Sequence, residues 1–346
     1  MLITNMKPPG QFTSIGGQAV IEGVMMRAPH FIAVAVRKPN KRIVIKNTPY
    51  TGLAQRFPVF RKPVLRGIVM LIESMVQGIS ALSYSANVAA EDETSGEELS
   101  KLAIALSIAS AVVLGLALFV ALPHLLTALT TSSQVTAKSP WFHLVDGVFK
   151  MAILLAYVYL IALMDDIHRV FQYHGAEHKS IYAFEAGKEL TVENARPFTT
   201  LHPRCGTSFL LFLVVISIIV FSIVFPLFGL TQFSTIPFVN HTLMVVVKIF
   251  LMIPVAGLSY EFIKMCACRM DNAVFRAMIW PGMVLQRLTT REPSDDQLEV
   301  ALASLRHVLK MEKEGSASTE QSPEFEISEL GEIGVVAAQV AEFPEH

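Results

Sequence analysis

Long apolar runs are the dominant pattern along this chain. Four of them, at 102–126, 144–164, 208–230 and 242–262, have roughly the 20 residues that a helix needs to cross a bilayer. Because backbone N–H and C=O groups within lipid must hydrogen-bond to each other, each run is expected to be helical. Lys248, inside the last run, is expected to extend toward the interface. The pattern predicts a mainly α, polytopic membrane protein with about four transmembrane helices.

A fifth helical pattern, at 64–90, is less apolar than these four. Glu73, Gln77 and several Ser and Gly residues interrupt its apolar positions. We interpret it as an interfacial or partly buried amphipathic helix, and whether it enters the membrane stays open at this point. An acidic linker at 91–98 joins it to the first predicted span.

Shorter patterns lie on either side of the predicted spans. Two runs rich in β-branched residues, 31–37 and 42–46, flank a Lys-Pro-Asn-Lys turn and predict a small β-hairpin after the glycine-bearing stretch at 16–23. Ser294 and Gln297 have the spacing of a capping box. They predict a C-terminal helix that continues to about residue 310 and lies in the cytoplasm.

The last part of the chain is rich in Glu and Ser and is expected to be disordered, although 327–340 keeps enough apolar residues to dock on a partner. The chain is thus predicted to have distinct regions. They are an N-terminal region (1–63), the amphipathic helix with its linker (64–98), a four-helix membrane region that includes a motif-bearing loop at 165–207 (99–262), a C-terminal helical region (263–311) and the acidic tail (312–346).

The composition agrees with a protein whose first partner is the lipid bilayer. Hydrophobic residues make up 52% of the chain and charged residues 16%, against about 25% charged in ordinary soluble domains. The net charge of −1 gives no reason to expect a nucleic-acid partner. The first sixty residues lack the apolar core of a signal peptide. Three cysteines, an odd and sparse set, favour a reducing compartment over a disulfide framework.

Basic residues in the flanks of the spans predict the orientation. Residues 1–66 contain eleven Lys and Arg side chains, and the loop at 165–207 contains five. The loop at 127–143 has one, and the loop at 231–241 has none. Because Lys and Arg accumulate on the cytoplasmic side, both termini and the 165–207 loop are predicted to be cytoplasmic. The protein is therefore expected in the cytoplasmic membrane, the bacterial-type inner membrane.

The sequence His174-Gly175-Ala176-Glu177-His178 is the strongest chemical signal in the chain. Residues four apart share one face of a helix, so His174 and His178 can bind one metal ion. Glu177 points about 100° around the helix from His178, which suits proton transfer to a metal-bound water better than coordination. H-x-x-E-H is the order of the inverzincin metallopeptidases. The alternative is that both histidines only pack the end of a long helix.

A turn before the third span offers a third ligand. His202 and Cys205 are three residues apart there, next to Pro203 and Gly206. A catalytic zinc ion takes three protein ligands and keeps one position for water, so either His202 or Cys205 would complete the set. The alternative is a loop tightened by Pro and Gly, in which the cysteine is a small apolar filler.

Other charged residues make up an additional candidate site. Glu22 is the only acid among the first 66 residues, and it is either a metal ligand or an ion-pair partner of Arg27 or Arg66. Glu261 lies near membrane depth, where ionisable residues are costly and often functional, or it pairs with Lys264 at the interface. The residues of this additional candidate site are Glu22, Arg27, Arg204 and Glu261.

Several of these motifs together resemble the YqhQ-like family, domain-of-unknown-function family 1385. The resemblance implies a bacterial-type integral membrane protein and a metal-dependent enzyme, with no stated substrate. It covers about residues 13 to 310 and excludes the acidic tail. The residues that carry it are Gly16–Arg27, Tyr173–Lys179, His202–Phe209, Pro281-Gly282, Leu285-Gln286, Leu288–Thr290 and Glu292-Pro293.

Two classes of function follow from these observations. The first is a hydrolase that depends on a divalent metal, most simply zinc, and acts from the cytoplasmic side on a lipid-linked or membrane-protein substrate. The second is a non-catalytic protein of membrane assembly, membrane-protein turnover or transport, in which the same polar motifs hold helices together.

Overall fold

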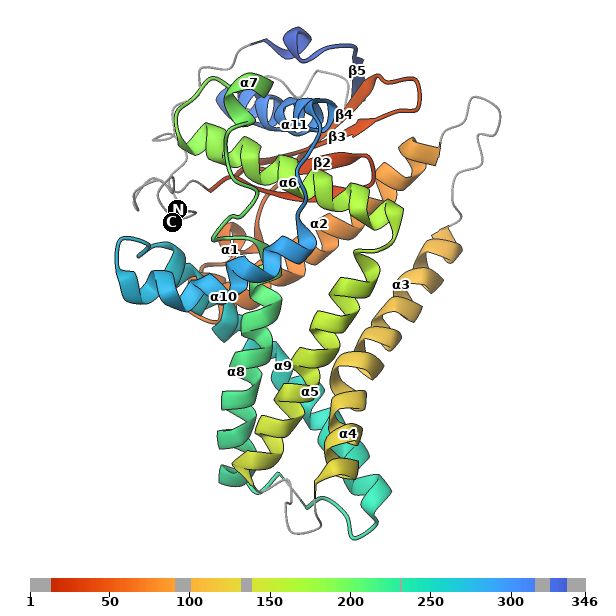
Figure 1. Ribbon diagram of the computed structural model, residues 1–346, viewed down its shortest axis with the longest axis vertical. Helices are drawn as coiled ribbons and strands as arrows, with labels where there is room; N and C mark the ends of the chain where they lie inside the picture. Colours follow the sequence, from red (N-terminus) through yellow and green to blue (C-terminus); the bar gives the residue numbers. More distant parts are fainter. Residues whose placement is uncertain (1–13, 91–100, 132–138, 231, 315–323, 335–346) are drawn as a thin grey trace.

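The computed structural model describes residues 14–90, 101–131, 139–230, 232–314 and 324–334. It has two parts, which Figure 1 shows one above the other. The upper part combines a β-sheet with helices, and the lower part is a bundle of long apolar helices. The predicted acidic linker at 91–98 lies outside the described residues.

The sheet is antiparallel and its strands follow chain order. The predicted hairpin is present as its third and fourth strands, but the sheet is larger than predicted because the glycine-bearing stretch forms a second hairpin and the tail adds a strand at the edge. The strands are β1 (Gly16–Val20), β2 (Gly23–Arg27), β3 (Phe31–Arg37), β4 (Ile43–Pro49) and β5 (Glu324–Ile327).

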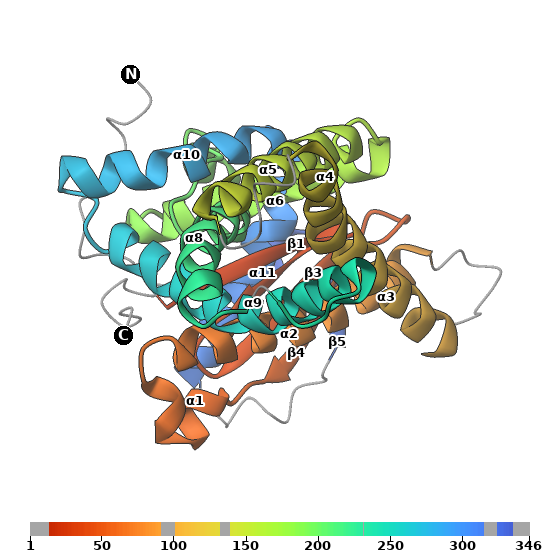
Figure 2. The ribbon, with the colours of Figure 1, turned by 90° about the horizontal axis from the view of Figure 1, so that it is seen from below.

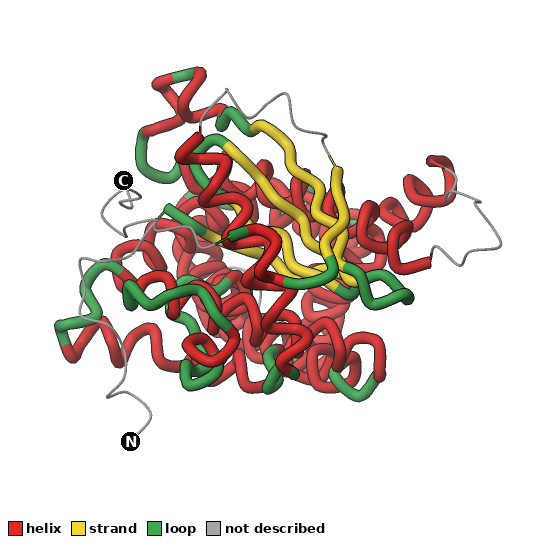
Figure 3. Tube along the Cα trace, turned by 90° about the horizontal axis from the view of Figure 1, so that it is seen from above, coloured by secondary structure: helices red, strands yellow, loops and turns green. Residues whose placement is uncertain are grey.

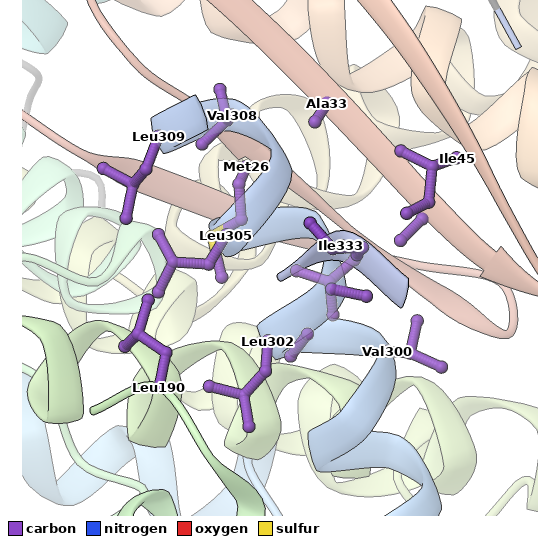
Figure 4. Close-up of a cluster of buried hydrophobic side chains, with 14 of the residues drawn as sticks. Met26, Ala33, Ile45, Leu190, Val300, Leu302, Leu305, Val308, Leu309 and Ile333 are labelled. Carbon is purple, nitrogen blue, oxygen red and sulfur yellow. The ribbon is translucent and has the colours of Figure 1, made fainter. Parts of the chain in front are cut away.

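Both faces of the sheet are buried because apolar residues occupy successive positions of its strands. Met26, Ala33 and Ile45 lie on the face that α6 (Asp165–Glu185) and α11 (Asp295–Glu314) cover (Figure 4). The opposite face packs on α2 (Leu65–Ala90). The sheet therefore lies between α2 on one face and α6 and α11 on the other. Figure 3 shows the strands from above, with helices around them.

The helix at the C-terminal end begins as its sequence predicts. Ser294 Oγ accepts the backbone N–H of Gln297, and the Gln297 side chain accepts the backbone N–H of Ser294, so the capping box is present. The helix is buried on nearly all sides, from Leu298 to Leu309. It therefore forms the core of the sheet part and is not a surface element.

The tail is partly ordered, which corrects the prediction of disorder for this region. Its strand pairs with β4 along the sheet edge, and Ile327 and Ile333 are buried. The reason is packing, because these apolar side chains join the core between the sheet and α11. Predicted disorder elsewhere in the tail lies outside the described residues.

The lower part of the molecule contains the predicted spans. Figure 2, seen from below, shows α4, α5, α8 and α9 clustered together. The spans begin and end within a few residues of the predicted positions, except that the last extends further at both ends. They are α3 (Lys101–Leu116), which continues through a π-helical turn (Ala117–Ala121) into α4 (Leu122–Thr130), then α5 (Pro140–Ile161), α8 (Gly206–Leu227) and α9 (Pro237–Ala267).

Further helices connect the sheet part and the bundle. The segment predicted as a loop at 165–207 begins with α6, which is continuous for 21 residues. A long helix, α10, lies across the top of the bundle (Figure 1). The remaining elements are α1 (Leu53–Arg56), a 3-10 turn (Pro58–Arg61), α7 (Val192–Ala195), α10 (Ala273–Thr289) and a second 3-10 turn (Leu330–Ile333).

Five of the described helices are long and apolar enough to cross a membrane, and α2 is the one beyond the predicted four. Its first half packs closely on α9, where a Cβ at Gly67 would lie 2.9 Å from Tyr260. Its second half packs on the sheet through Ala81 and Val88. The helix is therefore partly buried, as its mixed composition predicts.

The sheet limits how many of these helices can cross. Residues 43–46 of β4 pair with residues 324–327 of β5, so both lie on the same side of a membrane. The chain between them must then cross an even number of times. Helix α6 packs on the same sheet, so it lies on the same side of a membrane as β4 and β5. The number of crossings before α6 and the number after it must therefore each be even. With α2 held on the sheet, the four spans predicted from the sequence satisfy this condition, two of them before α6 and two after it.

Candidate metal centre

Helix α6 brings both histidines of the H-x-x-E-H motif to one place. Between them, Gly175 lets the chain after α10 pass directly over the helix, because a Cβ there would lie 2.0 Å from the carbonyl oxygen of Arg291. The backbone N–H of Arg291 donates to the carbonyl of Phe171, which holds this crossing segment in place. The glycine is therefore required by the close approach of two backbones.

Each histidine has one ring nitrogen fixed by a backbone carbonyl. His174 Nδ1 lies 2.9 Å from the carbonyl oxygen of Thr289, and His178 Nδ1 bonds the carbonyl oxygen of Thr200. A carbonyl oxygen only accepts, so both Nδ1 atoms carry a proton, and in the neutral form of each ring the lone pair is on Nε2. This is the arrangement that orients histidines in metal sites.

Cys205 completes a cluster of three ligand atoms. Its Sγ lies 3.2 Å from His174 Nε2, and ligand atoms of His174, His178 and Cys205 lie within 4.8 Å of one another. The cysteine is buried and stands at the N-cap of α8, where its sulfur accepts the backbone N–H of Thr207. A helix N-terminus favours negative charge, which suits a thiolate.

The pKa shifts of Cys205 and His174 agree with this geometry. Burial raises the pKa of the Cys205 thiol, but the imidazoles of His174 and His178 outweigh it and bring the pKa well below its ordinary value. Burial lowers the pKa of His174, but the neighbouring sulfur outweighs it and raises the pKa to about 9. The surroundings therefore stabilise a negatively charged sulfur, the form that binds metals or attacks as a nucleophile.

Glu177 lies beside this cluster and against the sheet. Its carboxyl group accepts a hydrogen bond from the backbone of Gly17, and it interacts with both imidazoles and with the sulfur. Burial raises the pKa of Glu177. A Cβ at Gly17 would lie 2.7 Å from Glu177 Cγ, so only glycine fits this position of β1 without displacement. The N-terminal motif and the α6 motif thus meet at one carboxyl group.

His202 lies next to the cluster but has other partners. Its Nε2 is 3.7 Å from a carboxylate oxygen of Glu185, which also pairs with Arg204. Burial lowers the pKa of His202 to about 4. Of the two candidates for a third ligand, the structure brings Cys205 into the cluster and directs His202 toward a buried ion pair.

Gln286 of α10 holds the turn that carries these two residues. Its amide group accepts the backbone N–H of His202 at 2.8 Å and donates to the His202 carbonyl at 2.7 Å and to Ser208 Oγ. The side chain is fully buried. Neither Gln286 nor Glu185 was singled out as a site residue from the sequence, and the only available signal was the Leu285-Gln286 pair in the family resemblance.

The additional candidate residues do not gather at the cluster. Glu22 adopts a left-handed conformation with φ 51° in the β1–β2 turn. Its carboxylate bonds Arg169 and Tyr173 of α6, in the stretch of the helix that leads up to His174. It pairs with neither arginine expected from the sequence. Arg27 instead bonds Gln77 and lies over the ring of Tyr50.

Glu261 also has a partner other than the expected Lys264. It forms a two-point ion pair with Arg66, and it accepts the backbone N–H of Val64 at the start of α2. This pair joins α2 to α9 and serves the fold.

Comparison with known proteins places the chain in a family. Residues 62–311 match the model of the family described as "Protein of unknown function (DUF1385)". The chain is 34% identical over 310 residues to "Uncharacterized protein YqhQ" of Bacillus subtilis (strain 168), which covers 86% of this chain and 92% of that protein. No solved structure matches the chain significantly. The chain belongs to the DUF1385 family, and His174, His178 and Cys205 all lie within the matched region.

Proposed function

We propose that the protein is a membrane-integral hydrolase whose metal ion, most simply zinc, is held by His174, His178 and Cys205. The observation that carries this proposal is the clustering of three ligand atoms from two separate segments, on the buried residues His178 and Cys205 and the half-buried His174. The fixed Nδ1 protons of both histidines support it, because each leaves Nε2 as the ligand.

The donor set fits zinc in chemistry and nearly in size. Bonds of about 2.0–2.1 Å to nitrogen and about 2.3 Å to sulfur place ligand atoms of a tetrahedral zinc site roughly 3.3–3.8 Å apart. The His174 Nε2–Cys205 Sγ distance is 3.2 Å, and the widest separation in the cluster is within 4.8 Å. Side-chain rotation that closes the widest pair by about 1 Å is enough. Three protein ligands leave a fourth position for water, as in catalytic sites.

The residues around this position have distinct roles in the proposal. A bound zinc ion supplies hydroxide by lowering the pKa of its water to about 7. Glu177 takes up the proton, and its bond to the backbone of Gly17 keeps its carboxyl group in place. Thr200 and Thr289 fix the ligand histidines through their carbonyl oxygens.

The position of the site suggests the class of substrate. Cys205 immediately precedes α8, which is a candidate span. The cluster therefore lies where the bundle meets the sheet part. A membrane-associated substrate, either lipid-linked or part of a membrane protein, would reach this level. The basic flanks favour the cytoplasmic side for the site and for both termini.

Metal analysis of the purified full chain tests the proposal, with an affinity tag that contains no histidine. One zinc ion per chain is expected for the wild type and for Glu177→Gln, because Glu177 is not a ligand. His174→Ala and Cys205→Ala should each lose the metal. His202→Ala is the matched control for removal of an imidazole next to the cluster, and it should keep the metal. Equal metal content in all variants would contradict the ligand set.

The distance between the sulfur and His174 also favours a second candidate, a thiol-dependent hydrolase. In that reaction Cys205 Sγ forms a bond to a carbonyl carbon, the leaving group departs with a proton from His174, and water later cleaves the thioester. Alkylation separates the candidates. A bound zinc ion protects Cys205 from iodoacetamide until a chelator removes it, whereas a nucleophilic Cys205 reacts rapidly in either case.

A further inference from the structure

A second polar cluster lies inside the bundle, away from the candidate metal centre. Its central residues are Asp146 and Lys150 of α5, Lys248 of α9 and His124 of α4, each between 0 and 3% exposed. The prediction that Lys248 extends to the interface is wrong, because its ammonium group lies 3.0 Å from Asp146 Oδ1. A carboxylate within hydrogen-bonding distance stabilises a buried lysine side chain more than an interface that the side chain does not reach.

The cluster forms an unbroken chain of hydrogen-bonding distances. His241 Nδ1 lies 2.9 Å from His124 Nε2, and His124 Nδ1 lies 3.1 Å from Lys248 Nζ. Lys248 contacts one oxygen of Asp146, and Lys150 lies 3.2 Å from the other. His241 is partly exposed in the first turns of α9, at the end of the bundle that lies farthest from the sheet in Figure 1. The chain therefore leads from the surface into the bundle.

The charges of this chain do not balance if every group takes its usual form. Two lysines face one aspartate, which leaves one positive charge without a partner at membrane depth. The nearest neighbours are aromatic, since Phe221 lies beside both ammonium groups and Phe142 beside Lys248. An unpaired buried charge is costly, so the stable state has one lysine as a neutral amine.

We propose that this cluster binds one exchangeable proton within the membrane, with Lys248 as its acceptor and His241 and His124 as its path from the distal surface. Loading forms one N–H bond at Lys248 Nζ and removes one proton from the water outside. Each histidine accepts a proton on one nitrogen and releases one from the other, so its charge is unchanged and its tautomer is exchanged; transfer in the reverse direction on unloading restores the first tautomer. Unloading is the reverse of this transfer.

The groups that face the cluster come from every helix around it. His124 belongs to α4, whereas His143, Asp146 and Lys150 belong to α5. His143 packs against the ring of Phe225. Helix α9 provides His241 and Lys248, and α8 has no ionisable side chain in its sequence. Lys248 is the acceptor because it alone contacts both the carboxylate and a histidine.

Proton counting on the purified full chain in detergent tests this proposal. The pH is lowered from about 9 to about 6, and the protons taken up by the protein are counted. An ordinary lysine, with a pKa near 10.4, stays charged throughout this range and takes up no proton. The wild type should take up one proton more than Lys248→Met. Lys188→Met, which removes an exposed lysine, is the matched control and should equal the wild type. Equal uptake by Lys248→Met and the wild type would show that Lys248 keeps one protonation state throughout this range and would overturn the proposal.

Two further variants keep the result interpretable. Lys248→Arg retains a cation that does not lose its proton, so it should also lack the extra proton even if the methionine variant folds poorly. His241→Phe should retain the uptake phase that is missing in Lys248→Met but slow it several-fold after a rapid pH jump. An unchanged rate for that phase would overturn the histidine path.

Discussion

The two polar clusters of this protein differ in whether the chain itself supplies a cation to them. In the candidate metal centre, Nδ1 of His174 and of His178 faces a backbone carbonyl, and the second ring nitrogen of each converges with the sulfur of Cys205. In the bundle, the side-chain nitrogens of Lys248 and Lys150 lie 3.0 and 3.2 Å from the two carboxylate oxygens of Asp146. The first cluster presents donors to a cation that the chain does not provide, whereas the second already contains its own cations.

This difference shows that burial of ionisable groups does not by itself identify a metal site. Both clusters contain buried histidines, and both contain a carboxyl group. The directions of the side-chain nitrogens distinguish the two clusters. His124 and Lys248 point their nitrogens toward each other. His174 and His178 instead each have one nitrogen at a backbone carbonyl and the other directed toward Cys205. A divalent cation is therefore expected to act on the first cluster only.

The largest effect should separate two substitutions within the bundle. Asp146→Asn leaves two lysines without a counter-charge, and loss of one partner of a buried pair costs about 3–5 kcal/mol. Lys248→Met leaves Asp146 and Lys150 as a balanced pair, so it should cost much less. Unfolding of the detergent-solubilised chain, followed by circular dichroism, measures both. Equal destabilisation by the two variants would contradict the charge imbalance.

A somewhat smaller effect should come from zinc itself. A ligand present at 100 times its dissociation constant stabilises the folded state by about 2.7 kcal/mol. The wild type should therefore unfold at a higher temperature with zinc than with a chelator. Lys248→Met should show the same zinc-dependent increase, whereas Cys205→Ser should lose most of it. A zinc response that depends on Lys248 and not on Cys205 would reverse the assignment of the two clusters.

The smallest effect should come from the contact between the sheet and the metal centre. At Gly17, an added methyl group would overlap Glu177 Cγ and the sulfur of Met26, so Gly17→Ala is expected to destabilise the chain by about 1–3 kcal/mol. Gly16→Ala is the control because nothing lies within 4 Å of a Cβ there. Thermal unfolding of the two variants measures the difference. Identical stabilities would argue against the close packing of β1 on α6.

The sequence predicted those features that depend on local patterns. Apolar run lengths located the spans, and the spacing of Ser294 and Gln297 located the start of α11. The pair at positions 174 and 178 was placed on one helical face in the same way. These features need only the period of a helix and the chemistry of its ends, both of which can be read from neighbouring residues.

The features that the sequence did not predict depend on contacts between distant segments. The pairing of Glu22 with Arg169, of Glu261 with Arg66 and of Lys248 with Asp146 joins residues that no period relates. The strand at 324–327 was missed because its few apolar residues form no long pattern, and only β4 and α11 make it stable. The position of His202 outside the cluster likewise depends on Glu185, which lies 3.7 Å from the histidine at the C-terminal end of α6.

The metal centre is tested most directly by X-ray absorption at the zinc edge, measured on the full chain loaded with one equivalent of zinc. Coordination by His174, His178 and Cys205 predicts one sulfur at about 2.3 Å together with nitrogen or oxygen ligands at about 2.0–2.1 Å. The sulfur contribution should disappear in Cys205→Ser and stay in His202→Ala. A spectrum with only nitrogen and oxygen ligands in the wild type would contradict the proposed site.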